Sequence, residues 1–431
     1  MISTRDFLLL FLVAIVSSSI AIFLRGARGT HENVQVTSLV QGDELQFDSI
    51  QSISIRRNGK AVLFERKDRK WWQVEPFEMR MDFLSMQNVI TSVQSVQEIG
   101  NVSTKTDLDT VGLGESANTI SLADDTNVLE IKLGRKTLGG RAYAQMNDAS
   151  PVLIDQSLHR IAIDMDYKLW RDTRLFPDFA IDGVRIDRVI NGDRLLLDRT
   201  GGRWEMLQPV STRVDQNILL EWVGRIAASH VGSFVQDEPN DLALFGLHSP
   251  IATFGVEDGK GTTHTLLVGG RVSAGSEDRY VMLEGIPVVF RVQWEPLSQL
   301  FPASEIFVDA TGSAVSRFDV KRVLIRTGSE ELVFERNLES WLKSDGVPLD
   351  TEKVNALMTW LLETKPPEVS IGEYPRANEL ALITLIGYDQ LPLDTVRIAQ
   401  AENGLVILEN GDNVLRWHPA ESLEALRPFI D

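Results

Sequence analysis

The chain of 431 residues has a formal net charge of −18 at pH 7, 43% hydrophobic and 24% charged residues, a balance typical of a globular protein with roughly two to four domains. So acidic a chain is not expected to bind nucleic acid or to adhere broadly to anionic lipid headgroups, since both are bound by clustered Lys and Arg. The sequence contains no Cys, which excludes disulfides, thiolate zinc sites, iron–sulfur clusters and cysteine nucleophiles.

The first predicted element is an apolar segment. Residues 7–24, FLLLFLVAIVSSSIAIFL, carry no charge, and as a helix they would span roughly 27 Å, close to the thickness of a bilayer core. A cleaved signal peptide is the alternative, but its apolar region is usually about 7–15 residues long, and the following LRGARG is a poor cleavage site. We therefore expect a single-pass membrane anchor at 1–28 and a linker at 29–46.

The location of the body follows from the same segment. Arg25 and Arg28 argue weakly for a cytoplasmic body by the positive-inside rule. An N-terminal apolar segment is, however, the usual export signal, and long domains translocate largely regardless of charge. We therefore expect an inner-membrane protein with its body in the periplasm, outside the cytoplasm.

A threefold internal repeat follows the linker. WWQVEPFEMRMD begins at Trp71 and WEMLQPVSTRVD begins at Trp204, and their Trp, Pro and final Asp are each 133 residues apart. A more divergent third copy begins at Trp341. Together with the closing motifs LWRD, IFVD and PFID, these matches define repeat units at 47–172, 181–309 and 318–431. The recurring positions are Arg66, Arg199 and Arg336; Trp71, Trp204 and Trp341; Pro76 and Pro209; and Asp82, Asp215 and Asp350.

Each unit has the same predicted order of elements. It begins with a β-hairpin, because apolar and polar residues alternate around Asn58-Gly59, Asn191-Gly192 or Thr327-Gly328. The period then becomes helical, since apolar residues stand 4, 7, 8 and 11 positions after the recurring Asp. These residues are Met86, Val89, Ile90 and Val93; Leu219, Trp222, Val223 and Ile226; and Val354, Leu357, Met358 and Leu361. With further short strands after the helix, the predicted fold class is α+β: an N-terminal transmembrane helix followed by three tandem repeats, each an antiparallel sheet with an amphipathic helix.

The recurring residues have structural explanations. Asp82, Asp215 and Asp350 stand where the N-cap of the predicted helix belongs, and Pro76 and Pro209 end the strand before it. The recurring Trp residues follow a strand and are expected in the core. A catalytic Asp and a sugar-stacking Trp are the alternatives that we consider less favoured.

Arg80 and Arg213 also match each other, whereas the third unit has Pro348 at that position. A duplicated anion site is one explanation of this match. A solvated surface Arg is the simpler one.

No motif points to catalysis. None of the six His recurs at a matched position, and the chain has no H-E-x-x-H, Walker, G-x-G-x-x-G or G-x-S-x-G motif. The acidic turns DDTN and DGKG lack the twelve-residue calcium-loop pattern. We therefore expect a protein that is not an enzyme, with no catalytic, cofactor-binding or metal-ligating residues. The His residues are His31, His159, His230, His248, His264 and His418.

The anchor, the repeated strand–hinge–helix phrase FER…W….P…..D and the Gly-Leu loops at Gly112-Leu113 and Gly246-Leu247 resemble a bacterial domain family of unknown function. That family is found beside ABC transporters of the gliding-motility type. The resemblance covers most of residues 45–431, and the third unit departs from it most. It implies an auxiliary subunit that works with a transporter permease, an ATPase and a second auxiliary protein.

Three functions are compatible with these observations. The favoured one is a membrane-anchored, non-catalytic scaffold subunit of an ABC-type envelope transport complex. The second is a cell-wall or polysaccharide binding module, which would require Trp72, Trp294 or Trp417 to gather on one exposed face. The third is an envelope hydrolase with an unrecognised pair of carboxylates.

Overall fold

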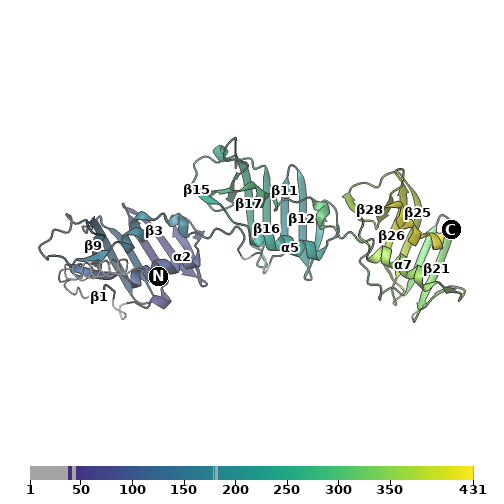
Figure 1. Ribbon diagram of the computed structural model, residues 1–431, viewed down its shortest axis with the longest axis horizontal. Coiled ribbons are helices and arrows are strands. Elements are labelled where there is room, and N and C mark those ends of the chain that lie inside the picture. Colours follow the sequence, from purple (N-terminus) through teal and green to yellow (C-terminus); the bar gives the residue numbers. More distant parts are fainter. Residues whose placement is uncertain (1–36, 41–44, 178, 180–182, 339, 431) are drawn as a thin grey trace, which may run out of the picture. The chain divides into compact units, whose positions relative to one another are not determined.

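The computed structural model describes residues 37–40, 45–177, 179, 183–338 and 340–430. The chain divides after Asp172 into two compact units, each of which is described by itself. The first unit holds one large sheet and the second holds two. Figure 1 labels their elements.

The first unit contains a ten-stranded antiparallel sheet and one long helix, α2 (Phe83–Gln94). From edge to edge its strands are β1 (Thr37–Ser38), β6 (Gln97–Asn101), β10 (Val152–Asp155), β9 (Arg141–Met146), β8 (Val128–Thr137), β7 (Asn118–Ala123), β2 (Ser52–Arg57), β3 (Lys60–Lys67), β4 (Lys70–Glu75) and β5 (Met79–Arg80). Its short helices are η1 (Phe47–Ser49), α3 (Ser157–His159), η2 (Arg160–Asp164) and η3 (Tyr167–Trp170).

The second unit begins with a nine-stranded antiparallel sheet and α5 (Gln216–Ala227). The strand order is β14 (Thr212–Arg213), β13 (Arg203–Gln208), β12 (Asp193–Thr200), β11 (Arg185–Ile190), β16 (Ala252–Glu257), β17 (Thr263–Arg271), β18 (Arg279–Leu283), β19 (Val288–Val292) and β15 (Ser233–Asp237). Its short helices are η4 (Leu242–Phe245), α6 (Trp294–Ser298) and η5 (Ser304–Phe307).

The other sheet of the second unit also has nine strands, with α7 (Thr351–Leu362) as its long helix. The order is β23 (Pro348–Leu349), β22 (Ser340–Lys343), β21 (Glu330–Asn337), β20 (Arg322–Thr327), β25 (Ala377–Ile386), β26 (Pro392–Ala401), β27 (Val406–Glu409), β28 (Val414–His418) and β24 (Glu368–Ile371). Its short helices are η6 (Ala420–Ala425) and α8 (Arg427–Ile430).

The three sheets share one topology. Four strands run from the first hairpin to one edge, the long helix follows, and the next strand forms the opposite edge before four more strands fill the space between. Apart from the added β1, each sheet comes from one of the three sequence repeats. We refer to them below as the first, second and third sheets.

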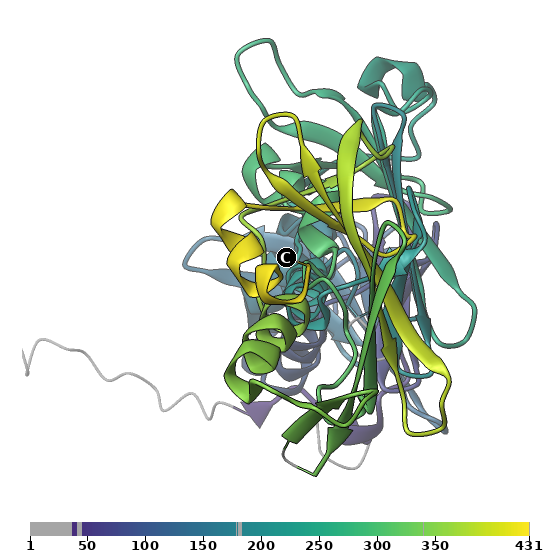
Figure 2. The same ribbon diagram turned by 90° about the vertical axis from the view of Figure 1, so that its right-hand side faces the viewer.

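Local sequence explains the turns and the cores. Asn58 and Gly59 both have positive φ, as do Asn191 and Gly192, which is the backbone that a two-residue hairpin turn requires. All twelve apolar residues expected on the helices are buried against their sheets. In the third sheet α8 packs on the same face as α7 (Figure 2). Phe429 of α8 stacks on Phe334 with ring centroids 5.6 Å apart.

Two sequence predictions are wrong. The protein is mostly antiparallel sheet rather than α+β, because each repeat carries nine strands of a continuous ladder and only one twelve-residue helix. Within the described ranges, no helix is both long and apolar enough to cross a membrane, which contradicts the single-pass inner-membrane protein with a periplasmic body. The apolar segment 7–24, on which that prediction rested, lies outside the described residues.

Candidate functional site

The recurring Trp and Arg residues lie in the same place in each sheet. Trp71, Trp204 and Trp341 are 1–3% exposed and point into the cores. In the third sheet, Trp341 packs edge-on against Phe334, and the guanidinium of Arg336 lies 5.0 Å from the centre of the Trp341 ring. The amide nitrogens of Arg66, Arg199 and Arg336 donate to the carbonyls of Gln51, Val184 and Lys321, respectively. These residues therefore hold each repeat together.

The recurring Asp residues cap the long helices. Oδ1 of Asp82 accepts from the Ser85 amide at 2.8 Å, and Asp350 accepts from the Glu352 amide at 3.0 Å. Oδ1 of Asp215 accepts from two amides of the first turn of α5. Its other oxygen accepts from Nζ of Lys365 at 2.6 Å. Burial raises the pKa of Asp215, but hydrogen bonds from Lys365 and the helix amides outweigh burial and lower it overall.

The peptide bonds before Pro76 and Pro209 are both cis, and each lies between the third and fourth strands of its repeat.

The matched Arg80 and Arg213 pair with the Asp that closes their own repeat. Nε of Arg80 lies 3.1 Å from Oδ2 of Asp172, and Nε of Arg213 lies 3.7 Å from Oδ2 of Asp309. In both repeats the backbone supports the pair, since the closing Asp donates its amide to the carbonyl of the matched Arg. The side chain of Arg80 is 18% exposed. The match therefore reflects an ion pair that joins the hinge to the end of the repeat, a role that the sequence did not reveal.

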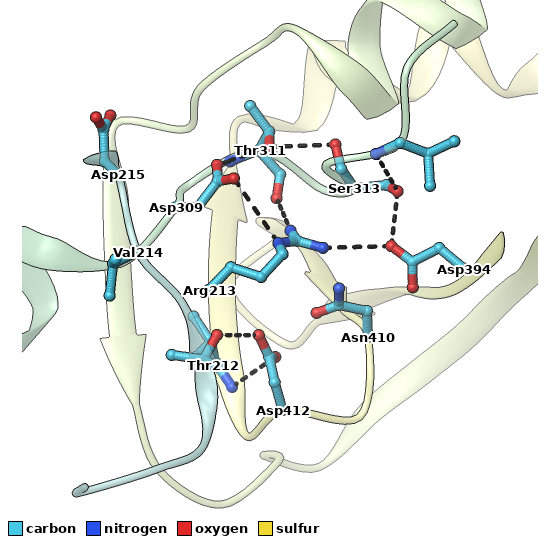
Figure 3. A network of polar contacts seen from close by, with 12 residues as sticks. Thr212, Arg213, Val214, Asp215, Asp309, Thr311, Ser313, Asp394, Asn410 and Asp412 are labelled. Carbon is cyan, nitrogen blue, oxygen red and sulfur yellow. Dashed lines mark hydrogen bonds and ion pairs between the residues drawn. The ribbon is translucent and has the colours of Figure 1, made fainter. Parts of the chain in front are cut away.

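Within the second unit, Arg213 also reaches the third sheet (Figure 3). Its Nη1 lies 3.3 Å from Oδ2 of Asp394 at the start of β26, and its Nη2 donates to the carbonyl of Thr311 at 3.1 Å. The same Oδ2 of Asp394 accepts from the hydroxyl of the buried Ser313 at 2.6 Å. One guanidinium thus joins the second sheet, the connecting segment and the third sheet.

A second ion pair lies beside this one and is more deeply buried. The guanidinium of Arg416, in β28, is fully buried and contacts both carboxylate oxygens of Asp412, at 3.3 and 3.0 Å. It also donates to the Asp309 carbonyl and to Oδ1 of Asn410. From the second sheet, the hydroxyl of Thr212 donates to Oδ2 of Asp412 at 2.6 Å. Burial raises the pKa of Asp412, but the bonds from Arg416 and Thr212 outweigh this effect and lower it overall.

We call this set the 2–3 junction; its members are Thr212, Arg213, Asp309, Thr311, Ser313, Asp394, Asn410, Asp412 and Arg416. Each carboxylate in it has a cationic partner and each cation has at least one carboxylate or carbonyl acceptor. These charge-assisted hydrogen bonds hold the two sheets in one arrangement. The 2–3 junction therefore has the composition of a structural contact between two sheets.

The remaining candidate groups are engaged locally. His418 is 1% exposed, and burial together with the neighbouring Arg416 lowers its pKa to about 4. Burial also lowers the pKa of His159, whose Nε2 contacts the Gly134 carbonyl at 2.8 Å. The amides of Gln46 and of the turn at Thr126 and Asn127 donate to Asp124 and lower its pKa, and amides of its own turn lower the pKa of Asp258. Across the described part of the chain, no group of three or more His, Asp or Glu is placed to hold a metal. His31 lies outside the described residues.

The three Trp residues considered for sugar stacking are half-buried. The ring of Trp294 is covered by the guanidinium of Arg279 at 5.0 Å, and Nε1 of Trp417 donates to the Ser370 hydroxyl at 2.8 Å. Trp72 belongs to the first sheet, Trp294 follows the last strand of the second, and Trp417 lies in the third. They therefore belong to three different repeats.

The Gly-Leu loops recur in structure as well. Gly112 and Gly246 have positive φ, and Leu113 and Leu247 are buried, each donating its amide to a carbonyl five residues earlier. A Cβ on Gly246 would lie 2.6 Å from the amide nitrogen of Gly270, so this loop requires glycine.

Comparison with known proteins gives one match. No curated protein and no solved structure matches the chain. The one match is to a family model and covers a stretch that runs from Trp204 in β13 into β24. This stretch contains Thr212, Arg213 and the connection to the third sheet. A domain of unknown function, DUF4340, is found at these residues, 204–369.

Proposed function

We propose that the protein is a non-catalytic scaffold subunit of an ABC-type transport complex of the gliding-motility kind. Its partners would be the transporter permease, the ATPase and a second auxiliary protein. The ATPase must be a separate chain, because this sequence has no phosphate-binding loop of its own.

The observation that carries the proposal is that the matched Trp, Asp and Arg positions of the repeat have structural tasks. The recurring Trp fills the core, the recurring Asp caps the helix, and the matched Arg pairs with the closing Asp. A module repeated three times with its packing residues matched is typical of proteins that present an extended binding surface. The resemblance of the repeats to the family found beside such transporters supplies the partners.

The 2–3 junction supports the same proposal. It commits buried charges to holding two sheets of the second unit in one arrangement, and such a device stabilises a surface that spans both sheets. A scaffold needs this property, because a partner that contacts both sheets otherwise bears the entropy cost of ordering them.

The test is affinity purification of the tagged full-length chain from its native cells in a mild detergent, with mass spectrometry of the proteins that co-purify. We expect a permease and an ATPase in amounts close to that of the tagged chain, and recovery of the chain when the ATPase carries the tag instead. The matched control is the same tag on an unrelated acidic protein.

Recovery of the chain without any permease or ATPase would overturn the proposal. Co-sedimentation with purified cell-wall sacculi in that case would favour the polysaccharide-binding function. Replacement of Trp294 by Ala would then test whether an aromatic side chain carries that binding.

A further inference from the structure

The hinge of the third sheet is shorter than its counterparts. Eleven positions separate Trp71 from Asp82, but nine separate Trp341 from Asp350. As a result β22 has four residues, whereas β4 and β13 have six each. Pairing of β21 with β22 ends at Lys343, and the chain then turns back at once, with the Gly346 amide donating to the Lys343 carbonyl.

This shortening leaves a groove of about 650 Å³ beside the end of β22. Val333 and Leu342 line it, as do Lys321, Arg322, Glu335 and Lys343. The counterparts of Val333 are Leu63 in the first sheet and Leu196 in the second. Each pairs with a residue of the neighbouring longer strand, Leu63 with Glu75 of β4 and Leu196 with Gln208 of β13. We call the space in the third sheet the β21–β22 groove.

A lysine replaces a core residue at this groove. Lys343 is paired with Phe334 in the same register in which Gln73 is paired with Phe64 and Met206 with Leu197. Gln73 and Met206 are completely buried, whereas Lys343 is exposed. Among the residues that the structure describes, the ammonium of Lys343 has no ion-pair or hydrogen-bond partner.

Two further cations line the groove. Lys321 occupies the position of Gln51 and Val184, and its Nζ lies 2.9 Å from Oε1 of Glu335 and donates to the Arg336 carbonyl. Nη2 of Arg322 lies 3.0 Å from Oε2 of Glu335. Three cations thus line the groove beside a single carboxylate, that of Glu335, which pairs with two of them. This leaves a local excess of positive charge in a chain whose net charge is −18.

We propose that the β21–β22 groove binds the carboxylates of an acidic peptide segment of a partner protein. The contacts of Glu335 show that Lys321 and Arg322 already receive a carboxylate in this geometry, and Lys343 offers an unused ammonium beside them. Val333 and Leu342 provide apolar contact that suits a peptide better than a free inorganic anion. The repeats supply the reference, because the matched strand is longer in the two other sheets and carries the buried Gln73 or Met206 in place of the lysine. This proposal deepens the scaffold function and rests on it for the identity of the partner.

The experiment measures fluorescence polarisation of a fluorescein-labelled hexaglutamate peptide titrated with the full chain at about 50 mM salt, where charge interactions are screened less than at physiological salt. We expect saturable binding that Lys343→Glu weakens about tenfold or more, because an anion then faces the peptide. Lys260→Glu makes the same change of net charge in an exposed turn of the second sheet, and we expect it to change the affinity less than about twofold. Thermal unfolding of both variants verifies that they are folded.

Absence of peptide binding, or equal loss in the two variants, would overturn the proposal. Inorganic phosphate that displaces the peptide at a lower concentration than free glutamate does would also overturn it, since the site would then be one for phosphate groups. Co-purification distinguishes this failure from a failure of the scaffold function. If Lys343→Glu still co-purifies with permease and ATPase in wild-type amounts, the groove proposal is refuted and the scaffold function stands.

Discussion

The buried ion pair of the 2–3 junction gives the sharpest prediction about stability. In Asp412→Ala, the guanidinium of Arg416 stays fully buried but loses both oxygens of the one carboxylate that pairs with it among the described residues. Three acceptors remain within 3.3 Å: the carbonyls of Asp309 and Val414 and Oδ1 of Asn410. Removing one partner of a buried pair costs about 3–5 kcal/mol, and because these acceptors remain we expect about 3 kcal/mol for the second unit.

The assay is equilibrium unfolding in guanidinium chloride, followed by near-ultraviolet circular dichroism. Hydrogen–deuterium exchange of peptides that contain Thr212 and Arg416 assigns the transition to the second unit. Glu424→Ala removes an exposed carboxylate from η6 of the same repeat, and we expect it to change the free energy of unfolding by less than about 0.5 kcal/mol.

A double variant separates a charge effect from a simple loss of contact. Arg416→Met combined with Asp412→Ala removes the buried charge as well as its partner, so it should be more stable than Asp412→Ala alone. Equal stability of Asp412→Ala and Glu424→Ala would refute the reasoning. A double variant less stable than the single one would show that the guanidinium does not depend on this carboxylate.

Three further changes test the module itself. Trp71→Ala should lower the free energy of unfolding of the first unit by about 3–5 kcal/mol through an internal cavity, whereas its half-buried neighbour Trp72→Ala should cost about 1–2 kcal/mol; denaturant unfolding measures both. Asp82→Ala removes the cap on the Ser85 amide and should lower the free energy of unfolding by about 1 kcal/mol, within the range of ~0.5–2 kcal/mol that is usual for N-caps. Asp82→Asn should restore most of this loss. A loss below about 0.3 kcal/mol in Asp82→Ala, measured in the same way, would contradict the capping role. The folded His418 has its pKa lowered from 6.5 to about 4, so the unfolded chain binds more protons between these values and the free energy of unfolding should fall by about 3 kcal/mol as pH is lowered through this window. His418→Gln should lose that part of the pH dependence in unfolding curves recorded from pH 7 to 4, and an unchanged slope would show that another group titrates there.

The parts of the structure that sequence reasoning located are those governed by local rules. An Asn-Gly turn, a helix period and an N-cap Asp each depend on residues within a few positions of one another, and comparison of three copies strengthens each pattern. Trp71, Asp82 and the buried stripe of α2 were accessible in this way. The strand content was underestimated, because most of the seven strands after each opening hairpin have six residues or fewer, so that their period-two patterns are brief.

The candidate site was only partly accessible. Arg213 was singled out because it recurs, and Asp309 because it closes a repeat. Asp394, Asp412 and Arg416 gave no signal, since the comparison of repeats detects only what recurs. In the sequence, the region of β22 stood out only as a divergent third copy of the repeat. That divergence did not reveal that Lys343 is exposed where its counterparts are buried.

The sequence by itself determined the threefold repetition, the position of each long helix and the residues that cap and pack it, because neighbouring residues decide these features. Only the tertiary structure decided the single sheet topology behind the repeats and the charges that join the second and third sheets. Thr212 and Asp412 are 200 positions apart and meet at 2.6 Å. A contact of that kind depends on how two complete ladders pack, and a buried guanidinium selects its carboxylate by that packing rather than by spacing along the chain.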